Sequence, residues 1–164
     1  MIQVLCTGGT FEKAYGQGKG VRNFSFPQFS AMDEILQRVG IENVKVNYSL
    51  EKAKDSLDMN DADRNYIADW CQNEAGECAI VIHGTDTMIE SAEAVSKRAL
   101  NKVIIFTGAL QPARMRDSDA EFNFGGALIA AQTCAPGVYI VMSGKVFHWN
   151  ECQKNEETGC FEAK

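Results

Sequence analysis

Two short blocks of hydroxyl-bearing residues are the part of this sequence best suited to chemistry: Thr7-Gly8-Gly9-Thr10 and His83-Gly84-Thr85-Asp86-Thr87. A threonine hydroxyl is a weak nucleophile at neutral pH, so covalent catalysis requires a base that takes its proton and donors that hold an oxyanion. Backbone amides in glycine-rich turns can supply those donors. The two blocks therefore indicate a site for a small polar ligand, surrounded by hydroxyls, backbone amides and one carboxylate.

The base of such a site is not contained in the two blocks. Lys154 is a candidate if the segment after Met142 folds back over the site. A lysine acts as a base only after it has lost its proton, which burial or cationic neighbours favour, and Asp86 would orient it. If the segment does not fold back, Lys154 is a solvated surface lysine.

The positions of the blocks relative to the strands support a shared site. Each block follows an apolar, strand-like run, at residues 2–6 and 78–82, and Thr107-Gly108-Ala109 follows a third run at 103–106. Buried parallel strands have such near-continuous apolar runs, and open α/β sheets bind ligands at the carboxyl ends of their strands. We therefore expect the three segments to meet at one edge of a sheet.

The order of elements predicts the fold class. Strands are expected at 2–6, 44–48, 78–82, 103–106 and 138–142, and helices at 31–39, 62–73, 87–100 and 122–134. The first helix is capped by Ser30, ended by Gly40, and apolar at Met32, Ile35, Leu36 and Val39. A long polar loop, residues 11–26, precedes it. Strands alternating with helices predict a single-domain three-layer α/β sandwich, flavodoxin-like or Rossmann-like, with a mainly parallel sheet.

Composition limits the classes of partner. A net charge of −6 and a pI near 4.9 argue against a general nucleic-acid surface. The sequence shows no secretory signal and no apolar run long enough to span a bilayer, so a cytoplasmic protein without membrane contact is expected. Six cysteines and two histidines lack the usual zinc spacing, which predicts reduced thiols and no metal.

Taken together, the motifs resemble the amino-terminal domain of bacterial-type L-asparaginases, in order, at similar spacing and over nearly the whole chain. The matching positions are 7–10, 56–61, 83–88 and 107–109, with Pro112, Asp119, Phe122 and Asn123. The resemblance predicts an amino-terminal-type domain at 1–164, with the carboxyl-terminal domain of the family absent. It also implies hydrolysis of the side-chain amide of L-asparagine to L-aspartate and ammonia, by threonine-based catalysis without a cofactor.

The resemblance implies a role for individual residues. Thr10 corresponds to the nucleophile, and Thr85, Asp86 and Lys154 correspond to a second catalytic triad. Ser56 corresponds to a ligand of the substrate's α-carboxylate, and Asp86 to a ligand of its α-amino group; Thr85 lies in the same substrate-binding motif. Lys154 follows the strand ending at Met142 at the family's spacing, which supports its assignment as the base.

Two positions near the site depart from the family pattern. A tyrosine of the family's mobile loop assists the first threonine, and either Tyr15 or the position of Phe24 aligns with it. We favour Tyr15. The residue after the substrate-binding serine, commonly glutamine in one branch of the family, is Leu57 here, which removes one ligand of the substrate.

The largest departure is that the sequence ends at Lys164, whereas family members continue into a second domain that contributes a glutamate and closes the pocket. Homodimerisation through the exposed edge or the helices is the simplest replacement, so a homo-oligomer is expected. Glu157 and Glu162 are possible substitutes for the missing glutamate.

Each motif also has a plainer structural interpretation. His83 is expected to be a satisfied structural histidine, Asp86 could cap the helix that begins at Thr87, and Ser56 could simply begin a turn. Three functions remain for comparison. The first is an amidohydrolase acting on L-asparagine, with L-glutamine as a poorer substrate. The second is a non-catalytic amino-acid-binding domain. The third, the amide-hydrolysing part of a tRNA-dependent amidotransferase, is disfavoured because it would ordinarily need further domains.

Overall fold

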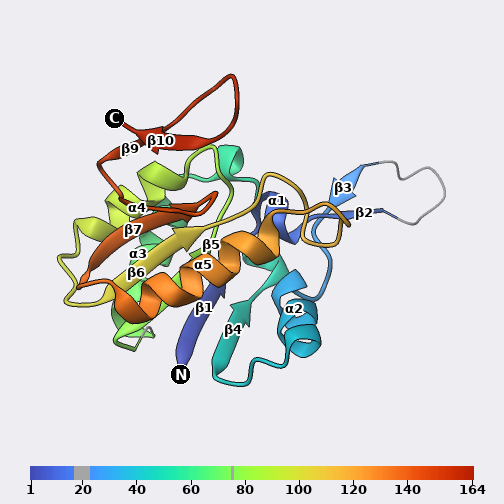
Figure 1. Cartoon of the computed structure of the whole chain (residues 1–164), viewed down its shortest axis with the longest axis horizontal. Coiled ribbons are helices and arrows are strands. Elements are labelled where there is room, and N and C mark those ends of the chain that lie inside the picture. The colour runs from blue at the N-terminus through green and yellow to red at the C-terminus, as the bar shows by residue number, and fades with distance from the viewer. Residues whose placement is uncertain (17–22, 75) are drawn as a thin grey trace.

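The computed structural model describes residues 1–16, 23–74 and 76–164, and a six-stranded sheet forms its centre (Figure 1). The first five strands in spatial order are parallel, and the sixth is antiparallel to the fifth. These six strands, in that order, are β4 (Val44–Tyr48), β1 (Ile2–Cys6), β5 (Cys78–Ile82), β6 (Val103–Thr107), β7 (Gly137–Met142) and β8 (Lys145–His148). The predicted α/β fold with a mainly parallel sheet is therefore confirmed.

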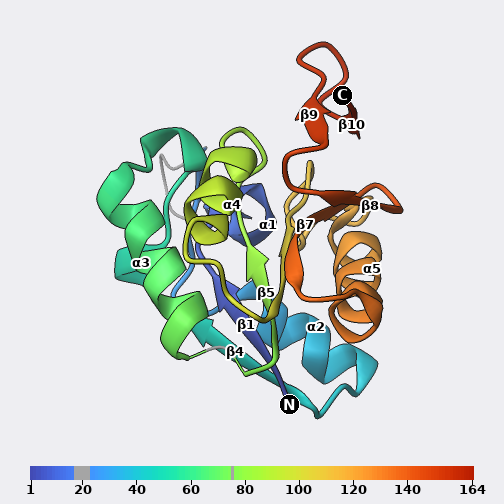
Figure 2. The ribbon, with the colours of Figure 1, turned by 90° about the vertical axis from the view of Figure 1, so that its left-hand side faces the viewer.

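Helices cover both faces of the sheet (Figure 2). On one face lie α3 (Asp61–Asn73) and α4 (Met88–Ser96), and on the other lie α2 (Ala31–Val39) and α5 (Ala120–Thr133). Because side chains alternate along a strand, neighbouring strand residues enter different cores. Leu5 and Val81 pack with α3 and α4, whereas Val4 and Ile80 pack with α2 and α5. The chain thus forms three layers with an apolar core on each side of the sheet.

Local signals set the ends of most helices. Ser30 Oγ accepts a hydrogen bond from Met32 N at 3.0 Å, and Gly40 ends α2 in the left-handed conformation. Val39 is 48% exposed, so the buried part of the predicted apolar face ends before the last residue of the helix. The predicted end of the third helix, at residue 100, is wrong: α4 ends at Ser96, because the chain tightens into a turn in which Ala99 N donates to Ser96 O.

Short elements gather beyond the carboxyl ends of the strands (Figures 1 and 2). The predicted loop at 11–26 contains two short strands that pair as a ribbon, which extends from the body of the molecule in Figure 1; residues 17–22 of that loop lie outside the described residues. The short elements beyond the carboxyl ends of the strands are α1 (Gly9–Glu12), β2 (Ala14–Tyr15), β3 (Phe24–Ser25), the 3-10 helices η1 (Leu50–Lys52) and η2 (Ser56–Asp58), β9 (Cys152–Lys154) and β10 (Phe161–Ala163).

The direction of the connections reverses between β1 and β5. From β1 the chain crosses to β4 through α2 on one face, whereas from β5 it crosses to β6 through α4 on the other. Such a reversal separates the two connections and leaves room at the carboxyl ends of the neighbouring strands, where doubly wound sheets bind ligands. Both threonine blocks follow the two strands at which this reversal occurs.

Candidate active site

The two threonine blocks approach each other most closely at their glycines, Gly9 and Gly84. Gly9 has a φ of +69°, and a Cβ on it would overlap the backbone nitrogen of Gly84. Gly84 in turn approaches Ser56, whose Oγ would lie 2.6 Å from a Cβ on Gly84. Only residues without a side chain allow these backbones to come so close. Thr10 and Thr85, each next in sequence to one of these glycines, are thereby carried to the same edge, as the sequence predicts.

Hydrogen bonds hold the first block in this place. Thr7 Oγ1 donates to Ile82 O at 2.9 Å, which joins the ends of β1 and β5. On the other side Lys54 N donates to Thr7 O at 3.0 Å, and Gly9 N donates to Lys54 O at 2.9 Å. The block is thus fixed between β5 and the segment that leads to Ser56.

Side chains at α1 and just after it add two further anchors. Lys13 Nζ forms an ion pair with Asp55 Oδ2 at 2.6 Å, a bond that lowers the pKa of the Asp55 carboxyl. Glu12 is fully buried; its carboxylate accepts hydrogen bonds from Ser30 Oγ at 2.6 Å and Ala31 N at 2.7 Å. Burial raises the pKa of Glu12, although both of these bonds oppose the rise. These contacts attach α1, and with it Thr10, to α2 and to the Ser56 segment.

The carboxyl-terminal segment brings Lys154 to Thr85 and Asp86. Lys154 lies at the end of β9, which pairs with β10 in an antiparallel hairpin. Its Nζ donates to Thr85 Oγ1 at 2.9 Å and forms an ion pair with Asp86 Oδ1. The side chain of Lys154 is 21% exposed and that of Asp86 is 46% exposed, so the pair remains open to solvent on one side. The sequence expectation that this lysine folds back over the site therefore matches the structure.

Asp86 does not act as a helix cap. The residue at the cap position of α4 is Thr87, and no side-chain cap bond is present there. Instead, Thr87 Oγ1 donates to Ser56 O at 2.8 Å, and Thr87 N donates to Ser56 Oγ at 3.4 Å. The Asp86 carboxylate is consequently directed to Lys154, while Thr87 fixes the position of the buried Ser56.

His83 has a structural role, because its imidazole is buried and both ring nitrogens lie against protein groups. It is fully buried, its Nδ1 lies 2.7 Å from Gly84 O, and its Nε2 lies 2.8 Å from Ser91 Oγ. Burial lowers the pKa of His83 to about 4. The ring is therefore neutral near pH 7, as expected for a satisfied structural histidine, and it holds the turn between β5 and the site.

Two predicted catalytic residues form no side-chain hydrogen bond with Thr85, Asp86 or Lys154 in the described chain. Thr10 lies on α1, and its hydroxyl forms no hydrogen bond with any described residue. Tyr15 lies on the ribbon that extends from the body in Figure 1, where its ring meets Phe24 edge to face and is 58% exposed. The structure thus brings Ser56, Thr85, Asp86 and Lys154 together with the Thr10 turn, whereas Tyr15 stands apart.

The remaining sequence candidates surround the site. Leu57 is 70% exposed on η2 and, with Asp86 and Lys154, borders an open cavity. Glu162 lies on β10, where its carboxylate accepts hydrogen bonds from Gln153 and Asn155. Glu157 lies in the connecting turn, with its backbone N donating to Asn155 Oδ1. Neither glutamate contacts the triad.

The loop after β6 is shaped by residues that the sequence marked without a role. The Asp119 carboxylate accepts hydrogen bonds from Leu110 N and Gln111 N. Asn123 donates to Gly108 O at 3.0 Å and accepts from Ser143 N at 2.9 Å. Together these bonds fix the third segment at the site edge.

Sequence reasoning missed three residues that position the site: Lys54, Glu12 and Thr87. Lys54 and Glu12 carry no local signal, because their partners lie in distant segments. Thr87 did carry one, since it belongs to the second threonine block, but its bond to Ser56 depends on the approach of two turns. The missed residues therefore share a dependence on contacts between segments.

Other chemistries find little support in the described part of the chain. All six cysteines are free, and burial raises the pKa of Cys6 well above its usual value and that of Cys71 to about 12, so these thiols are poor nucleophiles. Residues 1–16, 23–74 and 76–164 contain no group of three or more side chains suited to hold a metal ion. Within the same ranges, no helix has the length and apolar character needed to cross a membrane.

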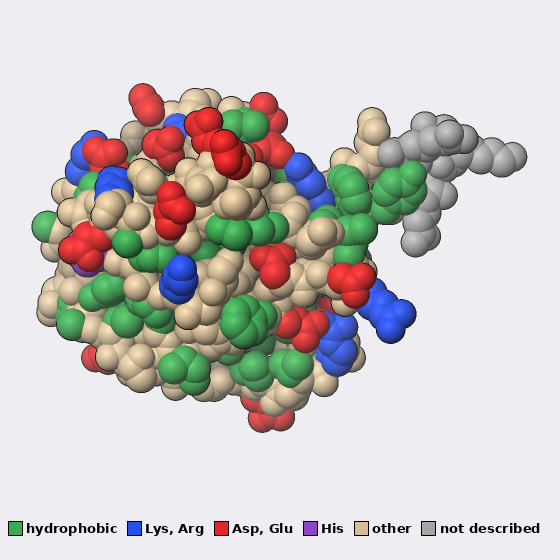
Figure 3. Space-filling view, turned by 45° about the horizontal axis from the view of Figure 1, so that its top comes forward, with side chains coloured by type: hydrophobic (Ala, Val, Ile, Leu, Met, Phe, Trp, Pro, Cys, Tyr) green, Lys and Arg blue, Asp and Glu red, His purple; other side chains and the backbone are tan. Residues whose placement is uncertain are grey.

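Charges of both signs are mixed at this edge of the sheet. In Figure 3, which brings the carboxyl ends of the strands forward, Lys and Arg side chains are scattered among Asp and Glu side chains instead of gathering in one basic patch. Such a face lacks the continuous positive charge that phosphate backbones attract.

Comparison with proteins of known sequence supports the resemblance. The family model "Asparaginase, N-terminal" matches residues 1–163. A glutamyl-tRNA(Gln) amidotransferase protein from Methanococcus maripaludis is 30% identical over 148 residues, covering 88% of this chain and 35% of that protein. L-asparaginase 2 of Escherichia coli is 28% identical over 174 residues, covering 96% of this chain and 47% of that protein.

Comparison with solved structures agrees with the sequence match. The thermostable L-asparaginase from Thermococcus kodakarensis superimposes with a TM-score of 0.83 at 25% identity, covering 99% of this chain and 50% of that one. The chain therefore spans about a third of the amidotransferase relative and about half of each asparaginase. Since the family model covers nearly every residue, this chain belongs to the asparaginase family.

Proposed function

We propose that the chain hydrolyses the side-chain amide of L-asparagine to L-aspartate and ammonia, with Thr10 as the nucleophile and Thr85, Asp86 and Lys154 as a triad. The observation that carries this proposal is the pair of contacts from Lys154 Nζ to Thr85 Oγ1 and Asp86 Oδ1. Lys154 is 69 and 68 positions from these two residues in sequence, and their meeting supplies a lysine next to a hydroxyl at the edge where the Thr10 turn lies.

In the proposed reaction, Thr10 Oγ1 attacks the amide carbon and its hydroxyl proton leaves to a base. The tetrahedral intermediate collapses when the amide nitrogen is protonated, so that ammonia departs and an ester to Thr10 remains. Water then adds to the ester, and L-aspartate leaves as the Thr10 hydroxyl is restored. The Thr85–Lys154 pair moves protons in these steps, while Ser56 holds the α-carboxylate and Asp86 the α-amino group. Tyr15 assists Thr10 if its ribbon reaches the site.

A binding domain without turnover is the alternative from another functional class. Binding of an α-amino acid needs a ligand for its carboxylate and one for its amino group, which Ser56 and Asp86 would provide. It does not need a lysine hydrogen-bonded to Thr85 in addition to a second threonine on a glycine-rich turn. The presence of both features favours catalysis.

Glutamine is a second candidate substrate, and the amidotransferase relative favours it. That relative is named for action on glutamyl-tRNA(Gln), and it is 30% identical to this chain over most of the chain's length. Leu57 occupies the position at which one branch of the family has glutamine. A substrate pocket with leucine there differs from that of the branch, which fits a different preferred substrate. In such a role the chain would release ammonia from glutamine for a partner protein. The other proposals are a homo-oligomer, a cytoplasmic location and catalysis without a cofactor.

The decisive experiment measures ammonia release from L-asparagine and from L-glutamine in parallel. We expect turnover with wild-type protein, and a loss of about a hundredfold or more in Thr10→Ala and Lys154→Ala, the scale that a nucleophile or a proton-transfer group contributes. A higher kcat/KM for glutamine would assign the second substrate.

The matched control is Lys145→Ala, because Lys145 is exposed on β8 and is not in contact with the site. It should keep wild-type turnover. All variants should show thermal melts close to that of wild type, since Thr10 and Lys154 lie outside the two cores. Wild-type turnover in Lys154→Ala would remove the lysine from the mechanism. Ligand-induced thermal stabilisation without turnover would make this a binding domain.

A further inference from the structure

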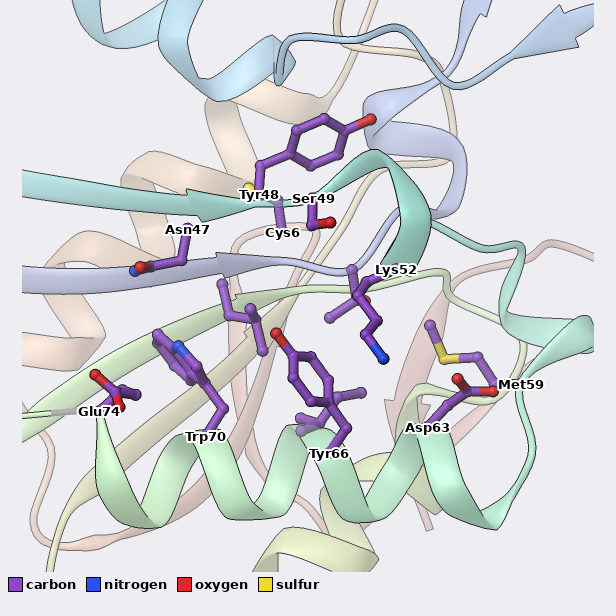
Figure 4. Close-up of a pocket in the computed structure, with 13 residues that line it drawn as sticks. Cys6, Asn47, Tyr48, Ser49, Lys52, Met59, Asp63, Tyr66, Trp70 and Glu74 are labelled. Atoms are coloured by element: carbon purple, nitrogen blue, oxygen red, sulfur yellow. The ribbon is translucent and has the colours of Figure 1, made fainter.

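A second cavity, of about 320 Å³, lies between α3 and the carboxyl ends of β1 and β4 (Figure 4). It opens because β4 is the edge strand and presents polar side chains such as Asn47 on this face, while its apolar Tyr48 points away from α3 in Figure 4. No further strand or helix in the described chain fills the angle between α3 and this edge.

The walls of the cavity suit a flat apolar molecule. Leu5 and Ile67 form apolar wall, and the rings of Tyr66 and Trp70, one helical turn apart on α3, stand side by side along it (Figure 4). Sites for small molecules are typically concave, largely apolar or aromatic, and carry a few polar groups that orient the ligand. This cavity has that composition and a volume at the lower end of the usual range for such sites.

One positive charge at the cavity forms no salt bridge with the described residues. Lys52 Nζ lies 5.0 Å from the centroid of the Tyr66 ring and forms no salt bridge with any described residue. The nearby Asp63 is held instead by Lys54, whose Nζ lies 2.7 and 2.8 Å from its two carboxylate oxygens. Burial raises the pKa of the Asp63 carboxyl, but the hydrogen bond from Lys54 and the nearby charge of Lys52 lower it overall. The Lys52 ammonium at this end of the cavity is therefore partly compensated, without being held in a salt bridge.

Two further donors are unused. The indole N–H of Trp70 and the hydroxyl of Tyr66, a residue that is 37% exposed, donate to none of the residues the structure describes. Neither atom is sealed in the interior, so both are open to a ligand in the cavity or to solvent. At the opposite end from Lys52, Glu74 closes the cavity in Figure 4 and disfavours a second negative charge there.

We propose that this cavity binds a small planar aromatic monocarboxylate, with its carboxylate at Lys52 and its ring against Tyr66 and Trp70. Charge complementarity selects the anion, because Lys52 forms no salt bridge with the described residues and Glu74 repels a negative charge at the far end. The aromatic walls select a flat ring over an aliphatic chain. The site is separate from the triad, so this proposal does not depend on the proposed amidohydrolase activity.

The test is calorimetric titration of the whole chain with phenylacetate. We expect saturable binding by wild-type protein and much weaker binding of 2-phenylethanol, which keeps the ring and lacks the charge. Lys52→Gln should bind phenylacetate about tenfold or more weakly, as expected for loss of a charged hydrogen bond. Lys45→Gln, which removes the same charge from exposed β4 without altering the cavity lining, should bind like wild type.

A second measurement locates the ligand. The chain has two tryptophans, so in a Trp149→Phe background Trp70 is the only indole, and phenylacetate should change its fluorescence with the affinity found by calorimetry. Saturating L-asparagine should leave phenylacetate binding unchanged. The proposal fails if wild-type protein does not bind phenylacetate at millimolar concentration, if Lys52→Gln binds it equally well, or if asparagine displaces it.

Discussion

Lys154 and His83 each carry a basic nitrogen, but their surroundings differ. Lys154 lies partly exposed between a hydroxyl and a carboxylate, and in the proposed mechanism it exchanges protons there. His83 is sealed under the same edge, and both of its ring nitrogens have partners within the protein. Residue type alone suggests histidine as the base; burial and hydrogen bonding favour the lysine.

The buried His83 predicts a loss of stability in acid. Its pKa is about 4 in the folded chain and about 6.5 when unfolded, so the unfolded state binds more protons between these values. The stabilising contribution is therefore complete above pH 6.5 and is lost as the pH falls toward 4, by up to about 3 kcal/mol. Urea unfolding at a series of pH values should show this slope in wild-type protein.

His83→Gln serves to isolate that contribution, because it removes the titrating group and leaves other groups in place. Its free energy of unfolding should fall less steeply than that of wild type between pH 6.5 and 4. His148→Gln, in which His83 is intact, should keep the wild-type slope. If the free energies of unfolding of His83→Gln and wild type change with the same slope between pH 6.5 and 4, His83 is not held neutral in the folded state.

At the scale of elements, the site depends on turns that approach one another without side chains. Gly8, Gly9 and Gly84 each lie where a Cβ would meet another backbone or Ser56. The three turns are then joined by the bonds of Thr7, Lys54 and Thr87. The residues of the candidate site therefore lie in the turns and short elements beyond the ends of the sheet strands, not within those strands or the long helices.

Gly9→Ala should disrupt this junction. The substitution forces a left-handed φ on alanine and places its Cβ against Gly84, so we expect a loss of at least about 2 kcal/mol of stability and most of the turnover. Gly125→Ala is the matched control on exposed α5, where nothing lies within 4 Å of the added Cβ; it should gain up to about 1 kcal/mol. Thermal melts and ammonia release would check both, and a neutral Gly9→Ala would contradict the close approach.

At the scale of the whole molecule, α5 has apolar side chains on its outer as well as its inner face. Phe124 and Ala127 are buried against the sheet, whereas Phe122 and Ile129 are 66% and 63% exposed. A helix that is apolar on all sides is normally covered. If the expected homo-oligomer forms, we propose α5 as the surface through which the copies meet.

Sedimentation velocity tests this expectation. Wild-type protein should sediment as a dimer at micromolar concentration, and Phe122→Asp should shift it toward the monomer by placing a charge in the contact. Leu50→Asp, an exposed apolar position on η1, should leave the dimer intact. A wild-type chain that remains monomeric at every concentration would show that the homo-oligomer expectation is wrong.

Much of this molecule is encoded locally. The strand runs at 2–6, 44–48 and 78–82 match their observed bounds, and Ser30 and Gly40 delimit α2. Apolar runs, caps and glycines act within a few residues, so they can be interpreted without the rest of the chain. Because parallel strands end at one edge, strand prediction also placed the Thr10 and Thr85 turns at the same side.

Only the tertiary structure decided which side chains meet. From composition and spacing alone Lys154 remained either a base or a surface lysine; the β9–β10 hairpin, which the sequence did not predict, carries it to Thr85. The roles of Lys54 and Glu12 and the cavity beside Trp70 likewise depend on backbone paths between distant segments. Local propensity sets the residues at which an element begins and ends. The packing of both cores decides the position of each element's end relative to the other segments.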